Sequence, residues 1–271
     1  MIKLIATDVD GTLVKDSSSD VYPEIMDTMQ SLKEKGVIIA IASGRQYTSI
    51  ARMFEPIAND LIFIAENGAH IKCRGTDMNV VSMNQEMARE IIKDLRKIPE
   101  SDIVVSTPQG CYLESKNDDF INLITYGYRN QVKVVEDILT EDITIIKVAV
   151  YRKGSIREIG ENILIPKWKD KCKTCMAGEE WVDFMDGSVD KGNALNLLQD
   201  FFHITAEETM VFGDNANDIG LLKAAEASYA VSTAREEVKK YAKHICGSYT
   251  DKGVYTILKR LDDSMKSQKG E

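Results

Sequence analysis

A chain of 271 residues exceeds the usual domain of roughly 100–200 residues, so its length predicts two domains, each with its own buried core. Acidic residues outnumber basic residues by 43 to 34, and the basic residues form no cluster, which argues against a nucleic-acid partner. No apolar run approaches the roughly 20 residues that cross a bilayer, and the five cysteines form no disulfide pattern. These features predict a cytoplasmic protein without a membrane partner, and they do not indicate its oligomeric state.

The N-terminal part alternates strand-like and helix-like segments. Three continuously apolar runs are typical of strands covered on both faces of a parallel sheet: KLIATD at 3–8, VIIAIAS at 37–43 and DLIFIAENGA at 60–69. Between the first two, residues 22–36 carry apolar side chains at helical spacing and end on a lysine and a glycine, a helix stop signal. This alternation predicts an α/β domain built on a doubly wound, Rossmann-like parallel sheet.

A different pattern occupies residues 81–184. We expect a helix at 84–98, short strands at 102–106 and 110–114, and another helix at 118–128. Because strands occur here in adjacent pairs as well as singly, this segment is predicted to be an inserted α+β domain, and 1–80 with 185–271 the domain that receives it. Its aromatic residues are expected in the core and are not assigned to a site, namely Tyr126, Tyr128, Trp168 and Trp181.

The α/β alternation resumes after the insertion. The segments are a helix KGNALNLLQDFF at 191–202, a strand TMVFGD at 209–214, a helix NDIGLLKAA at 217–225 and a short apolar run ASYAVS at 227–232. The final stretch, 262–271, is polar and is expected to be disordered.

Polar residues stand where four of the predicted strands end. In open α/β sheets, ligands bind beyond the carboxyl ends of the strands, and these ends carry Asp8, Ser43, Asn67 and Asp214. Any one of them could be a turn residue or a helix cap, but four together favour a site. Carboxylates brought together need a cation, and oxygen ligands select a hard ion, so Asp8 with Asp214 predicts a Mg²⁺ site.

The same edge of the sheet offers groups for a phosphate. Ser43 and the Gly44 amide follow a strand and are expected to open a helix, where an anion is stabilised. Lys191 opens another helix and opposes its dipole, which favours a functional role over that of a solvated surface lysine. Two readings stay open: Asp218 is either a helix cap or part of the site, and Arg45, expected just inside a helix, is either functional or merely exposed.

Four segments in this order resemble the motifs of the haloacid dehalogenase superfamily of phosphohydrolases: DVDGTL at 8–13, ASGR at 42–45, DKGNAL at 190–195 and GDNAND at 213–218. The large insertion resembles the cap of the Cof-like branch, whose members are mostly phosphatases of sugar phosphates and other small metabolites. The resemblance implies a Mg²⁺-dependent phosphatase acting on a small phosphorylated metabolite. One segment departs from the family pattern, because Ser232 and Thr233 replace a common Gly-Asn pair.

The resemblance also implies a role for each motif residue. Asp8 would be the nucleophile and Asp10 the general acid and base. Ser43, Gly44, Lys191 and Asn217 would hold the transferred phosphoryl group. The metal would be held by Asp8, the main-chain carbonyl of Asp10 and Asp214, with Asp218 ordering its surroundings.

Physical chemistry supports this division of roles. A carboxylate is a weak nucleophile that a phosphate dianion repels, so attack needs a divalent cation and a lysine to neutralise the developing charge. Two alternatives stay open at this point: a phosphomutase of the same superfamily, and a non-catalytic phosphate-binding regulatory module.

Overall fold

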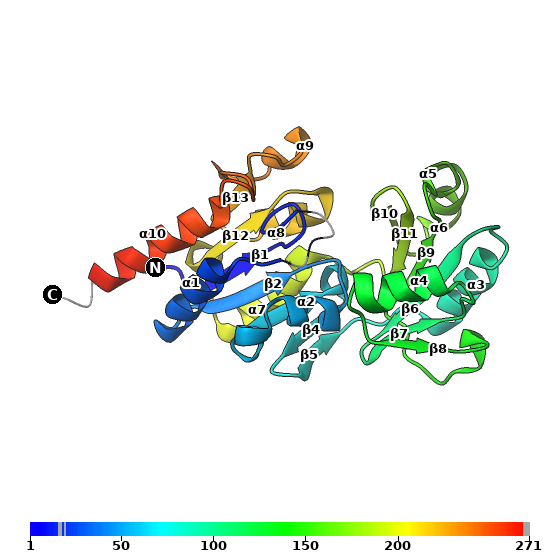
Figure 1. Cartoon of the computed structure of the whole chain (residues 1–271). Helices are drawn as coiled ribbons and strands as arrows, with labels where there is room; N and C mark the ends of the chain where they lie inside the picture. The colour runs from blue at the N-terminus through cyan, green and yellow to red at the C-terminus, as the bar shows by residue number, and fades with distance from the viewer. Residues whose placement is uncertain (16–17, 19, 268–271) are drawn as a thin grey trace. The chain divides into compact units, whose positions relative to one another are not determined.

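The computed structural model describes all residues except 16, 17, 19 and 268–271, and it divides into two units. The first contains Met1–Met78 with Asp190–Glu271, and the second is Asn79–Val189 (Figure 1). The second junction lies after Val189 and not at 184. The reason is local, because Lys173 Nζ donates a hydrogen bond of 2.6 Å to the Val189 carbonyl and holds this turn within the second unit.

Eight strands of the described chain form the sheet of the first unit. Its order is β14-β13-β12-β1-β2-β3-β4-β5, parallel from β14 to β3 and antiparallel between β3 and β4. The bounds are β1 (Leu4–Thr7), β2 (Ile38–Ala42), β3 (Ile62–Ala65), β4 (His70–Cys73), β5 (Thr76–Val80), β12 (Thr209–Gly213), β13 (Ala227–Val231) and β14 (His244–Cys246). The run at 60–69 is therefore not one strand, since β3 ends at Ala65 in a left-handed turn.

Alternate residues of the central strands enter two different cores. Ile5 packs with α1, α2 and α10, whereas Leu4 and Ala6 pack with α7 and α8 on the other face. The helices are α1 (Pro23–Glu34), α2 (Tyr47–Met53), α7 (Lys191–Phe202), α8 (Ile219–Lys223), α9 (Glu236–Lys239) and α10 (Gly253–Ser267). Helices on both faces of a mainly parallel sheet confirm the predicted doubly wound α/β fold.

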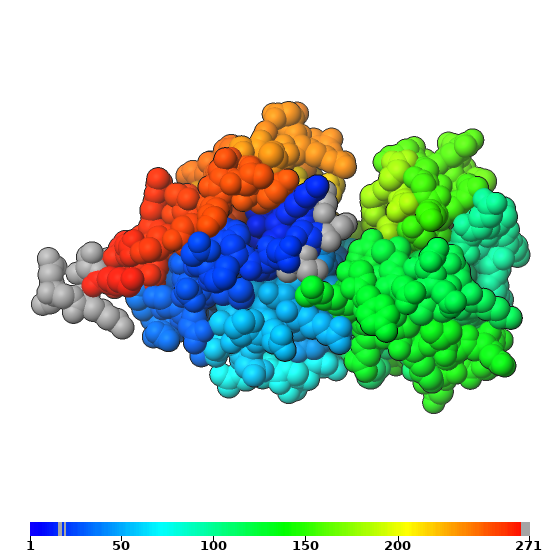
Figure 2. Space-filling view, in the orientation of Figure 1, coloured from blue at the N-terminus to red at the C-terminus, as the bar shows by residue number. Residues whose placement is uncertain are grey.

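The expectation of disorder is wrong for residues 262–267, because α10 continues to Ser267 and lies along α1 (Figures 1 and 2); residues 268–271 lie outside the described chain. Asp262 explains why the polar stretch is ordered. Its side chain is only 3% exposed and accepts bonds from Lys35 Nζ at 2.5 Å and Ser31 Oγ at 2.6 Å. Charged residues can therefore end a packed helix when their partners lie on a neighbouring one.

The second unit is an α+β domain. Six strands of its described residues form a sheet of order β10-β11-β9-β6-β7-β8, mostly antiparallel, with helix α3 packed on one face and α4 on the other. Its elements are α3 (Gln85–Leu95), β6 (Asp102–Thr107), β7 (Gly110–Leu113), α4 (Asp118–Asn122), β8 (Val132–Val134), β9 (Lys147–Tyr151), α5 (Arg157–Ile159), α6 (Ile165–Trp168), β10 (Lys173–Met176) and β11 (Trp181–Met185).

The aromatic residues of this unit divide between core and surface. Trp168 is buried, and Trp181 and Tyr128 pack against the cluster under α4. Tyr126 is 74% exposed, so the expectation that it lies in the core is wrong. Among the described residues, no helix is long and apolar enough to cross a membrane.

Candidate active site

The sheet order brings the predicted strand ends together. β1 lies between β12 and β2, and β3 follows β2, all parallel, so their carboxyl ends share one edge. Asp8 directly follows β1 and Asp214 directly follows β12, and the Asp8 amide donates to the Phe212 carbonyl at 3.0 Å. Ser43 follows β2 and is anchored to β3 by its amide, which donates to the Ile64 carbonyl at 2.8 Å.

Lys191 is the buried cation of the site. Its side chain is fully buried, and Nζ donates to Asp8 Oδ1 at 2.6 Å and to Asp218 Oδ1 at 2.7 Å. The alternative of a solvated surface lysine is therefore wrong. Burial lowers the pKa of Lys191, but the charges of Asp218 and Asp8 outweigh this and raise it, which keeps the ammonium charged.

Two glycines allow α7 and α8 to approach closely enough for this contact. A Cβ atom added at Gly192 would lie 2.4 Å from the main-chain carbon of Gly220, which is closer than any real contact. Gly192 also donates its amide to the N-cap Asp190 at 2.8 Å. The start of α7 is thus fixed against α8, and Lys191 is aimed at Asp218.

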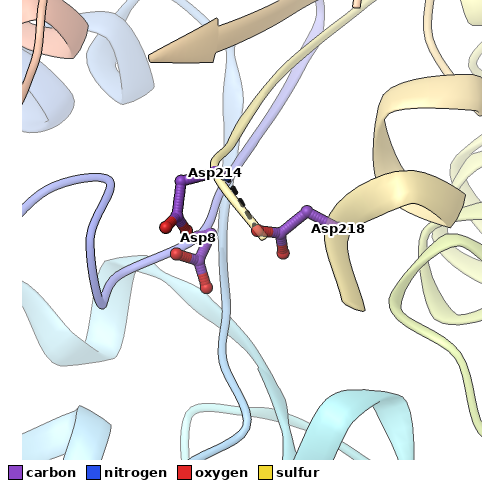
Figure 3. A group of neighbouring side chains, drawn as sticks. All are labelled: Asp8, Asp214 and Asp218. Carbon is purple, nitrogen blue, oxygen red and sulfur yellow. Dashed lines mark hydrogen bonds between the residues drawn. The ribbon is translucent and has the colours of Figure 1, made fainter. Parts of the chain in front are cut away.

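Asp218 combines both roles that its sequence position left open. Its Oδ2 accepts the main-chain amide of Asp214 at 3.0 Å (Figure 3). It also accepts the main-chain amide of Asn215 at 3.1 Å, a bond that completes a capping box with Asn215. Its Oδ1 accepts from Lys191. The side chain therefore caps a short 3-10 helix, Ala216–Asp218, and at the same time orders the loop that carries Asp214.

The cluster suits a hard divalent cation. Carboxylate oxygens of Asp8, Asp214 and Asp218 lie within 4.8 Å of one another, and Figure 3 shows the Asp8 and Asp214 carboxylates side by side. Asp8 Oδ2 is buried and has no hydrogen-bond partner among the described residues. Burial and then the charge of Asp218 raise the pKa of Asp8 well above its usual range, although the Lys191 ammonium lowers it. Oxygen donors with excess negative charge match the preference of Mg²⁺.

Asp10 lies outside this cluster and pairs with Arg45. Arg45 donates from Nε to Asp10 Oδ2 at 2.8 Å and from Nη2 to Asp10 Oδ1 at 2.5 Å, a two-point ion pair. Its side chain is 9% exposed, and Nη2 also donates to the Ser18 carbonyl at 2.7 Å. The expected position just inside a helix is wrong, because α2 begins only at Tyr47. Arg45 is therefore not merely exposed: it lies beyond the end of β2 and contacts the candidate site through Asp10.

The polar groups after β2 and β3 are also connected. Ser43 is 1% exposed, and its Oγ accepts the Arg45 amide at 3.1 Å. The prediction that Ser43 and Gly44 open a helix is wrong, because α2 starts three residues beyond Gly44 and both residues lie in a loop. Asn217 donates from Nδ2 to Asn67 Oδ1 at 2.9 Å, which joins the loop after β12 to the turn after β3.

The departure at Ser232 and Thr233 leaves an ordered turn. Ala234 donates its amide to the Val231 carbonyl at 2.9 Å, and the Arg235 amide faces the Asp214 carbonyl at 3.4 Å. The segment therefore lies beside the main chain of Asp214.

Comparison with known proteins identifies the family. The family model described as haloacid dehalogenase-like hydrolase matches residues 5–258. A 5-amino-6-(5-phospho-D-ribitylamino)uracil phosphatase of Escherichia coli is 28% identical over 260 residues, 96% of each chain. A solved structure from Eubacterium rectale is 37% identical, covers 96% of this chain and 99% of its own, and has a TM-score of 0.87. The chain therefore belongs to the haloacid dehalogenase-like hydrolases and is a phosphatase of their Cof-like branch.

Proposed function

We propose that this phosphatase is Mg²⁺-dependent and hydrolyses phosphomonoesters of small metabolites, with sugar or polyol phosphates preferred, through an aspartyl-phosphate. The observation that carries the proposal is the buried cluster in which Lys191 touches Asp8 and Asp218 while Asp8 Oδ2 has no hydrogen-bond partner within the described chain. A nucleophile with one oxygen held by a cation and one oxygen unbonded suits attack on phosphorus.

The first chemical step uses Asp8 and Asp10. A carboxylate oxygen of Asp8 attacks phosphorus, the bond from phosphorus to the leaving oxygen breaks, and Asp10 gives that oxygen a proton. Ser43, the Gly44 amide, Lys191 and Asn217 hold the phosphoryl oxygens. Asp8, the Asp10 carbonyl and Asp214 would hold Mg²⁺, whose charge offsets the repulsion between carboxylate and phosphate, while Asp218 orders the Asp214 loop.

The second step releases phosphate. Asp10, now deprotonated, takes a proton from water as the water oxygen attacks phosphorus, and the bond to Asp8 breaks. The enzyme is restored with Asp10 protonated and inorganic phosphate as product. Splitting the hydrolysis in this way replaces one difficult displacement by two easier ones.

The substrate class rests on the relatives. The Escherichia coli phosphatase, and a Bacillus subtilis phosphatase of the same name that is 23% identical, are named for a substrate whose phosphate sits on a ribityl chain. We therefore place the phosphate of the present substrate on a polyhydroxylated carbon chain.

The test is a panel of phosphomonoesters with Mg²⁺, including sugar phosphates, polyol phosphates and an aryl phosphate, with Asp8→Asn as the inactive control. We expect Mg²⁺-dependent release of phosphate, fastest with a sugar or polyol phosphate. Transfer of phosphate between positions of one sugar, requiring a bisphosphate activator, would instead indicate a phosphomutase. No turnover of any ester, with phosphate binding retained, would indicate a regulatory module.

A further inference from the structure

The turn after β3 has an unusual main-chain conformation. Glu66, Asn67 and Gly68 have φ angles of 50°, 58° and 105°, three successive left-handed residues of which two are not glycine. Left-handed non-glycine residues are uncommon and cluster at functional sites. Here the turn grips the loop after β2, because the Asn67 amide donates to the Ser43 carbonyl and the Glu66 amide to the Arg45 carbonyl, both at 2.9 Å.

This conformation places the side chain of Asn67 between two loops. The residue is 7% exposed, and its Oδ1 accepts from Asn217 Nδ2 at 2.9 Å. The same Oδ1 lies against Gly44, since a Cβ atom added there would be only 3.1 Å away. Asn67 thus contacts both Gly44 and Asn217, the two residues whose uncharged N–H groups are proposed to bind phosphate.

We propose that Asn67 is a positioning residue for phosphate recognition, an inference that rests on the proposed function of Gly44 and Asn217. A side-chain amide nitrogen carries two hydrogens. When one hydrogen of Asn217 Nδ2 is fixed on Asn67, the direction of the other is fixed as well. The contact with Gly44 likewise sets how far the main chain of that loop lies from Asn217. A phosphoryl group then meets donors that are already oriented, so less ordering accompanies its binding.

The test removes the amide of Asn67 without straining the main chain. Asn67→Gly keeps the left-handed conformation, which glycine adopts freely. Arg74→Gly is the matched control, because Arg74 has a φ of 50° in an exposed turn. The measurements are the dissociation constant of inorganic phosphate with Mg²⁺ by calorimetry, KM and kcat for an aryl phosphate, and the thermal midpoint, for the full chain.

The expected result is selective. Asn67→Gly and Asn217→Ala each weaken phosphate binding and raise KM by about 3- to 30-fold, and the double variant loses less than the sum of the two single losses, because contacting residues couple. Arg74→Gly leaves both constants unchanged. If Asn67→Gly does not fold, the same cycle is run with Asn67→Ala, which also removes the acceptor and whose main-chain strain is common to both backgrounds and cancels.

If the unaltered enzyme binds phosphate and hydrolyses phosphomonoesters as expected, two results would overturn the inference and leave the proposed function intact. One is unchanged phosphate binding in a folded Asn67→Gly. The other is a double variant whose loss equals the sum of the two single losses. An unaltered chain that neither binds phosphate nor releases it from any ester would instead overturn the proposed function, and the inference with it.

Discussion

Replacing Lys191 by methionine should strongly destabilise the first unit as well as abolish turnover. The substitution keeps an unbranched side chain that is one heavy atom shorter, but removes the ammonium that bonds Asp8 at 2.6 Å and Asp218 at 2.7 Å. The side chains of Lys191 and Asp218 are fully buried and that of Asp8 is 6% exposed, so water cannot replace the lost partner. Removing one partner of a buried ion pair costs about 3–5 kcal/mol, because an uncompensated charge is left behind.

Urea unfolding at pH 7, followed by circular dichroism, measures this loss. Lys97→Met is the matched control: its side chain is 76% exposed, and such a change should stay within about 0.5 kcal/mol of the original stability. Mg²⁺ should restore part of the stability of Lys191→Met, since a ligand that binds only the folded state stabilises it. Adding Asp218→Asn should also restore stability, but not activity. A Lys191→Met protein as stable as Lys97→Met in metal-free buffer would refute the reasoning.

Three further outcomes are expected. Chelation should abolish hydrolysis of an aryl phosphate, Mg²⁺ should restore it and Ca²⁺ should substitute poorly; full activity in chelator would contradict the metal site. Acid quenching with labelled substrate should trap no phosphoenzyme in Asp8→Asn. Asp10→Asn should accumulate the phosphoenzyme and lose about 10²- to 10⁴-fold in turnover. Equal slowing of phosphoenzyme formation and of its hydrolysis in Asp10→Asn would contradict the role assigned to Asp10. Burial raises the pKa of Asp262, but its bonds from Lys35 and Ser31 outweigh this and lower the pKa to about 2. The stabilisation, up to about 2 kcal/mol, should therefore be complete above about pH 4 and lost towards pH 2, so that the stability difference from Asp262→Asn disappears there.

The features that the sequence predicts well are local. Continuous apolar runs mark β1 and β2, and the lysine-glycine stop marks the end of α1 at Glu34. Asp8 and Asp214 were found because each directly follows a strand, and a parallel sheet brings such ends to one edge. The alternation of strands and helices was enough to expect that sheet.

The features that the sequence hides depend on partners distant in the chain. Asp262 looks like part of a polar tail until Lys35, 227 positions away, is seen to bind it. Arg45 looks exposed until the neighbouring β1 brings Asp10 to it. The burial of Lys191 depends on the close approach of Gly192 and Gly220, which no periodicity of α7 reveals. In each case a charged residue is ordered by a tertiary contact and not by its local segment.

Asp8 and Asp10 illustrate how one short segment supports two different roles. The Asp8 side chain is 6% exposed, its Oδ1 is bonded to Lys191, and its Oδ2 is buried without a hydrogen-bond partner among the described residues. The Asp10 side chain is 30% exposed, and both its oxygens accept from Arg45. A nucleophile needs an oriented oxygen in a site from which water is excluded, whereas a proton carrier needs access to the leaving oxygen and to water. Two acids separated by one residue therefore lie in two different environments. For Asp10 to act as the acid of the first step, its carboxyl has to carry a proton and one of its oxygens has to leave Arg45, so the ion pair has to open during the reaction.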